Sequence, residues 1–264
     1  MNSFFYLDTN ICIDRLFGND SKAMEATFEK MNNANELCIS EYVVGEFIRT
    51  VLFDCCALHT IILEEENMTD VYRRIRKMCS HENKCLNRKG SRYNLILKNM
   101  DYPAPQNRRR TLAILSNDIR FLKKKFSLGL RVLPSSVNCK LPLQKPKKDN
   151  GRFKIEIHCE SNFDKVNCSL KDFMSNELSF LQTIASGSGI NEAFEDLREL
   201  ISKISDGSLQ SCALSHCKLL GDSIILKDCP SCYTLISRDY HLKLLSDIIG
   251  QKADYIEKAE KPKC

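Results

Sequence analysis

Hydrophobic and polar positions at the start of the chain form a short apolar run followed by an amphipathic stretch. The residues from Phe4 to Leu7 are apolar and aromatic, those from Asp8 to Asn10 are polar, and apolar residues then recur with helical spacing as far as Phe17. This pattern predicts a buried strand, a turn and a helix that Thr9 or Asn10 caps. Asp8 therefore lies at the carboxyl end of the predicted strand.

The next periodic segment predicts a second strand and helix. The strand covers Cys38 to Ser40, and the helix follows from Glu41 because positions 43, 44, 47, 48, 51 and 52 are apolar. Glu46 lies near the start of this helix, at the edge of its apolar face.

A similar arrangement closes the chain. Gly221 and Asp222 precede an apolar stretch that ends at Leu226, which predicts a helix with Asp222 at or next to its N-cap. A compact strand from Tyr233 then ends on Asp239, and a further helix is expected within 240–249. The alternation of strands and helices predicts an α/β protein with a mainly parallel central sheet flanked by helices.

The middle of the chain, 53–205, is expected to be mostly helical. Helical periodicity runs from 112 to 126 and polar residues from 134 to 151 predict an exposed loop. Alternation over 153–159 predicts a half-buried strand, and two helices are expected over 169–186 and 190–205.

Composition limits the classes of protein that the chain can be. At 264 residues and 43% hydrophobic it can bury a sizeable core. No run approaches the roughly 20 apolar residues of a membrane span, and no basic head precedes the first apolar run. We therefore expect a soluble, cytoplasmic protein with no membrane partner, in which the fourteen cysteines are buried hydrophobic residues, metal ligands or reactive thiols rather than disulfides.

Charge is concentrated in one segment. Residues 71–150 hold 21 basic and 4 acidic residues, a net charge of +17, whereas the rest of the chain is net acidic. Such a segment favours a polyanionic partner, and a phosphate backbone fits best. The candidate nucleic-acid-binding residues are Arg73, Arg74, Arg108, Arg109, Arg110, Lys123, Lys124 and Lys125. Three tyrosines among them either stack on unpaired bases or pack in the core: Tyr72, Tyr93 and Tyr102.

Four acids recur at strand ends and helix starts: Asp8, Glu46, Asp222 and Asp239. Each alone could cap a turn or face solvent. In a parallel sheet, however, ligands collect at the carboxyl ends of the strands, so the four can converge on one edge. Converging carboxylates either take up protons or hold hard divalent cations, and oxygen ligands suit Mg²⁺ or Mn²⁺.

These four blocks, taken in order, resemble the sequence blocks of PIN-domain nucleases, a family that includes toxin-type ribonucleases. The resemblance covers 1–52 and 206–264, with 53–205 as a basic insertion or remodelled helical region. It implies a PIN-like three-layer fold and assigns Asp8, Glu46, Asp222 and Asp239 to a catalytic metal site. Thr9, Asn10 and Ser237 would support that site by hydrogen bonds.

The resemblance implies a metal-dependent endoribonuclease that hydrolyses phosphodiester bonds in single-stranded RNA or structured loops, or in DNA. A role in toxin–antitoxin or antiviral defence would add an inhibitory protein partner. The alternative is a catalytically silent PIN-like scaffold that binds nucleic acid or a protein through its basic middle region.

A zinc site is a further, less favoured interpretation. Its ligands would be Cys212, Cys217, Cys229 and Cys232, because thiolates come in such pairs in zinc-binding modules. One continuous helix over 211–227 would hold the two pairs about 25 Å apart, whereas a break at Gly221 would let them approach.

Overall fold

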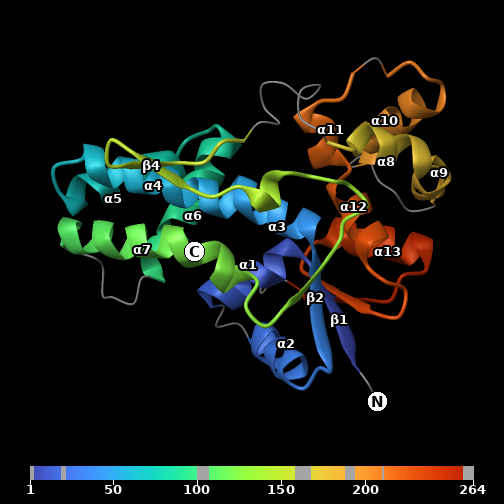
Figure 1. Ribbon diagram of the computed structural model, residues 1–264, viewed down its shortest axis with the longest axis horizontal. Helices are drawn as coiled ribbons and strands as arrows, with labels where there is room; N and C mark the ends of the chain where they lie inside the picture. Colours follow the sequence, from blue (N-terminus) through green and yellow to red (C-terminus); the bar gives the residue numbers. More distant parts are fainter. Residues whose placement is uncertain are drawn as a thin grey trace.

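The central sheet of the computed structural model has five parallel strands in the order β3-β2-β1-β6-β7. The structure describes residues 3–18, 22–99, 107–157, 168–187, 194–209 and 211–257. Helices separate the strands along the chain (Figure 1), which confirms the α/β class and the parallel sheet. In chain order the strands are β1 (Phe4–Leu7), β2 (Glu36–Ser40), β3 (Arg131–Leu133), β6 (Thr234–Ser237) and β7 (Ala253–Tyr255).

The apolar character of each strand matches its place in the sheet. Leu7 of β1 and Ile236 of β6 are fully buried, as a strand flanked and covered on both sides requires. Arg131 and Val132 are exposed on the edge strand β3. Parallel pairing places Leu7 opposite Ile236, so the carboxyl ends of the central strands lie at the same edge of the sheet.

Two helical segments begin where β1 and β2 end. The helix α1 (Thr9–Phe17) follows β1 after one residue, and α2 (Lys22–Asn32) leads the chain back to β2. The helix α3 (Glu41–Phe47) starts directly after β2 and continues through a π-helical turn, η1 (Ile48–Leu52), into α4 (Phe53–Glu64).

The middle region is built mainly of helices that lie beside α4, to the left of the sheet in Figure 1. They are α5 (Met68–Cys79), α6 (Lys84–Lys98) and α7 (Arg108–Phe126). The rings of Phe47 and Phe126 stack with centroids 3.9 Å apart, which joins α7 to α3. After α7 the chain enters the sheet as β3, so the middle region supplies one edge strand. The domain boundaries stay a prediction.

The predicted loop of 134–151 contains local structure. A 3-10 turn, η2 (Leu141–Leu143), precedes the antiparallel hairpin of β4 (Lys147–Asp149) and β5 (Arg152–Lys154). Asn150 and Gly151 form its turn with positive φ angles of 47° and 79°, which these residue types tolerate. The strand predicted over 153–159 is therefore shorter, and residues 158 and 159 lie outside the described residues.

The helices of the last third are shorter than the periodicity predicts. The helix expected over 169–186 divides at Glu177 into α8 (Leu170–Asn176) and α9 (Leu178–Ser186), and α10 spans Glu195–Ser205. Residues 190–193 of the predicted second helix are outside the described part of the chain. The remaining helices are α11 (Leu214–Leu219), α12 (Gly221–Asp228) and α13 (Tyr240–Ile249). No helix among the described residues is long and apolar enough to cross a membrane.

Candidate active site

Asp8 lies at the carboxyl end of β1 and caps α1. Its Oδ1 accepts a hydrogen bond from the Thr9 backbone N–H at 2.6 Å, and its Oδ2 accepts one from the Ser237 hydroxyl at 2.7 Å. The side chain is buried, and burial raises its pKa from 3.8 to about 7, with the negative charge of Glu46 as the next cause. The two hydrogen bonds oppose this rise because they favour the charged form.

Glu46 lies on α3 and is linked to Asp8 through Thr9. Its Oε2 accepts a hydrogen bond of 2.5 Å from the Thr9 hydroxyl, which links the end of β1 to a helix 37 residues later in the chain. The helix changes to π geometry two residues after Glu46, at η1, and such turns are frequent at functional sites. Thr9 is therefore placed where the sequence predicts a supporting residue.

Asp239 follows β6 and caps α13. Its Oδ1 accepts a hydrogen bond from the His241 backbone N–H at 2.9 Å, and its own N–H donates to the Ser237 hydroxyl at 2.9 Å. Ser237 thus connects Asp239 to Asp8. Asn10 supports the same segment, because its Oδ1 accepts a hydrogen bond from the Arg238 N–H at 3.3 Å.

Asp222 lies in the first turn of α12. Burial raises its pKa well above 3.8, and the negative charges of Asp239, Asp8 and Glu46 add to the rise. A Cβ at Gly221 would meet the Tyr42 hydroxyl at 3.0 Å, so the start of α12 packs closely against α3. The structure therefore brings the four predicted acids, which come from four separate segments, into one electrostatic environment.

The donor chemistry of this acid cluster (Asp8, Glu46, Asp222 and Asp239) suits a hard divalent cation. Nevertheless, no group of three or more His, Cys, Asp or Glu side chains within the described ranges is arranged to hold a metal ion. A hard divalent cation would offset the mutual repulsion of these carboxylates. Hydroxyls of Thr9 and Ser237 bind two of them.

Arg49 is a charged neighbour of the acid cluster that the sequence analysis missed. It lies three residues after Glu46, the spacing that puts two side chains on one helix face. Its Nη1 donates to the Cys217 sulfur at 3.6 Å, and its Nε is buried with no hydrogen-bond partner in the described part of the chain. The three-residue spacing from Glu46 could have indicated this neighbour from the sequence.

The four cysteines of the zinc interpretation do not form a ligand group. The helix does break before Gly221, as that interpretation needs. However, Cys217 packs against Tyr42 and Arg49, whereas the Cys229 thiol has the thiols of Cys38 and Cys232 as neighbours. The absence of a metal-holding group among the described residues includes all four.

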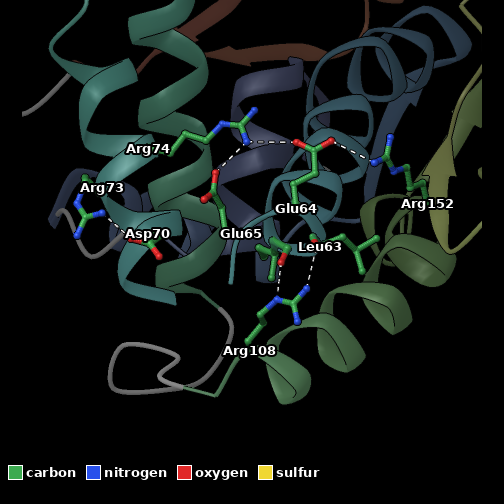
Figure 2. Close-up of polar contacts among 9 residues, drawn as sticks. Leu63, Glu64, Glu65, Asp70, Arg73, Arg74, Arg108 and Arg152 are labelled. Carbon is green, nitrogen blue, oxygen red and sulfur yellow. Dashed lines mark hydrogen bonds and ion pairs between the residues drawn. The ribbon is translucent and has the colours of Figure 1, made fainter. Parts of the chain in front are cut away.

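Several of the predicted nucleic-acid-binding residues make contacts within the protein. Figure 2 shows Arg73 paired with Asp70, and Arg74 bridging Glu64 at 3.2 Å and Glu65 at 3.0 Å. In the same view the Arg108 guanidinium donates to the carbonyls of Ile62 and Leu63, at 2.8 and 2.7 Å, near the end of α4. Arg73 and Arg74 thus form ion pairs with nearby acids, and Arg108 binds carbonyls at the C-terminal end of α4.

The lysine run on α7 is divided in the same way. Lys123 donates to the Pro142 carbonyl, and Lys125 pairs with Asp118 at 2.7 Å. Lys124, Arg109 and Arg110 are exposed. Of the interleaved tyrosines, Tyr93 is buried and Tyr72 half-buried, which favours core packing, and Tyr102 lies outside the described residues.

Comparison of the chain with protein-family models, with curated proteins and with solved structures finds no match in any of the three.

Proposed function

We propose that the protein is a metal-dependent endoribonuclease that hydrolyses phosphodiester bonds at the acid cluster. The observation that carries the proposal is the convergence of Asp8, Glu46, Asp222 and Asp239: burial, and after it the charges of the neighbouring acids, raise the pKa of Asp8 and Asp222. Buried acids whose pKa is raised, as it is for Asp8 and Asp222, disfavour folding in their charged form and cluster at functional sites, which favours a functional role for this cluster.

Each residue has a part in this function. Asp8, Glu46, Asp222 and Asp239 would hold Mg²⁺ or Mn²⁺, whose chemistry is to lower the pKa of a water nucleophile and to offset charge on the phosphate. Thr9 and Ser237 fix the carboxylates of Glu46 and Asp8, and Asn10 fixes the loop that carries Asp239.

RNA as the substrate is supported by the resemblance to PIN-domain nucleases and by positive charge that the protein leaves exposed. Several basic residues on α5, α6 and α7 are exposed and make no ion pair within the described residues, which gives phosphates a surface to contact. They are Arg76, Lys77, Lys84, Arg88, Lys98, Arg109, Arg120 and Lys124.

A cleavage assay tests the proposal. End-labelled single-stranded RNA, incubated with the purified chain, should be cut internally in Mg²⁺ or Mn²⁺ and stay intact in chelator. A single-stranded DNA of the same sequence, run in parallel, shows which sugar the site accepts. Binding of RNA without cleavage in either metal would contradict the proposal and favour the silent scaffold.

Arg108 and Lys124 are expected to behave differently although both lie on α7. Arg108→Ala should lower the free energy of unfolding by about 1–3 kcal/mol, because it leaves two carbonyls of α4 without a charged donor. It should leave the salt dependence of RNA binding unchanged. Lys124→Ala should leave stability within about 0.5 kcal/mol and lower the salt slope by about one phosphate contact.

Urea unfolding and RNA dissociation constants at several salt concentrations measure both effects. If Arg108→Ala lowers the salt slope of RNA binding and leaves the free energy of unfolding unchanged, the prediction is wrong: Arg108 then contacts RNA, and its hydrogen bonds to α4 do not stabilise the fold.

A further inference from the structure

Tyr240 is an exposed aromatic residue next to the acid cluster. It follows Asp239 directly as the first residue of α13, and 53% of its surface is exposed. The other large hydrophobic residues exposed on the described part of the chain lie on the middle region, far along the sequence from these acids: Leu95, Phe121, Leu128, Val132 and Leu143. Of these exposed side chains, Tyr240 is the one that adjoins an acid of the cluster in the sequence.

A second tyrosine supports this ring. Tyr255 ends β7, and its Cα is paired with that of Ser237, so it lies at the sheet edge where β6 delivers Asp239. The two tyrosine rings meet edge to face, with centroids 5.9 Å apart and planes at 68°. This geometry is favourable for aromatic rings and leaves ring surface of Tyr240 open to solvent.

The backbone on both sides of the pair is fixed. Asp239 caps α13 through the His241 N–H, and the N–H of Ile256, next to Tyr255, donates to the Ser237 carbonyl at 2.9 Å. A ring held by a capped helix and a paired strand loses little conformational entropy when a flat ligand stacks on it.

We propose that Tyr240, supported by Tyr255, is a stacking subsite for an unpaired nucleobase beside the phosphodiester at the acid cluster. This inference rests on the proposed function and adds a residue that contacts its substrate, because only single-stranded nucleic acid offers a free base face. Stacking tolerates any base, so the subsite favours unpaired RNA over duplex without specifying a sequence.

Binding measurements on variants in an Asp8→Asn background, which prevents cleavage, test the subsite. The probe is a fluorescent single-stranded oligoribonucleotide, with a series that carries one abasic nucleotide at successive positions. Tyr240→Ala should weaken binding roughly tenfold, Tyr240→Phe should stay within about twofold, and Phe121→Ala is the control because that ring is 50% exposed on α7. Circular dichroism verifies that each variant is folded.

The abasic series identifies stacking itself. At one position the abasic nucleotide should weaken binding to the Asp8→Asn protein. The same abasic nucleotide should not weaken binding further when Tyr240→Ala is also present. Equal affinities of Tyr240→Ala and Phe121→Ala for RNA would overturn the subsite. So would a Tyr240→Ala substitution that weakens binding to intact RNA and to every abasic RNA by the same factor. In either case, metal-dependent cleavage by the wild type would leave the proposed function in place. A wild-type protein that neither binds nor cleaves RNA overturns both.

Discussion

Asp8→Asn is expected to reduce RNA cleavage by at least about a hundredfold, to the level measured in chelator. The change removes one negative charge from the centre of the acid cluster and keeps the volume of the side chain. Loss of a residue that merely orients a metal ligand already costs 10- to 100-fold in activity or affinity, so loss of a ligand should cost more. Initial rates on labelled single-stranded RNA in Mg²⁺ and Mn²⁺ measure the effect.

Asp172→Asn is the matched control for this variant. Asp172 is exposed on α8, so the same chemical change there should leave the rate within about twofold. Equal rates for Asp8→Asn and the wild type would show that cleavage does not depend on the acid cluster, whatever its dependence on metal.

The second large effect is expected in the stability of the protein without metal. Asp222→Asn should raise the free energy of unfolding in chelator above that of the wild type. Burial and three neighbouring acids disfavour the Asp222 carboxylate, and a neutral amide removes that penalty. Urea unfolding of both proteins at pH 8, with Asp172→Asn as the control, measures the difference.

Metal should reverse the order of the two proteins. A cation that binds only the folded state at 100 times its dissociation constant adds about 2.7 kcal/mol to wild-type stability. The Asp222→Asn protein should gain much less from millimolar Mn²⁺ because it lacks one charge of the acid cluster. A variant that is less stable in chelator and gains as much from Mn²⁺ as the wild type would contradict this account of Asp222.

Because burial and neighbouring acids disfavour a charged carboxylate, the stability of the metal-free protein should depend on pH, as Asp8 illustrates. Its pKa is about 7 in the folded protein and 3.8 when unperturbed, so between these values the folded state binds more protons than the unfolded state. The stability contributed by the protonated side chain is fully present below pH 3.8 and is lost as the pH rises through 7. The whole shift corresponds to about 4 kcal/mol, of which about 2.7 kcal/mol is lost between pH 5 and 8, so unfolding in chelator over that range should show most of the fall.

The positions of the candidate acids could be predicted because their signals are local. An apolar run followed by a polar residue marks the end of a buried strand, and this pattern placed Asp8 and Asp239 correctly at the ends of β1 and β6. Parallel strands share one carboxyl edge, which is why acids far apart in sequence could be expected together. Glu46 and Asp222 followed from helix periodicity.

Other features depend on tertiary contacts that no local pattern carries. The edge strand β3 has three residues, two of them exposed, and it is a strand because α7 delivers it to the side of β2. Counting charges could not show that Arg108 caps α4 or that Lys123 binds the Pro142 carbonyl. The partner of each arginine is set by which helices pack together.

Direct titration with Mn²⁺ is the measurement closest to the central claim that the four acids form one cation site. Calorimetry on the wild-type chain should show at least one ion bound per chain, with affinity weakened tenfold or more in both Asp8→Asn and Asp239→Asn and unchanged in Asp172→Asn. Mn²⁺ binding that survives in both site variants at full affinity, or no binding by the wild type at millimolar Mn²⁺, would contradict the claim.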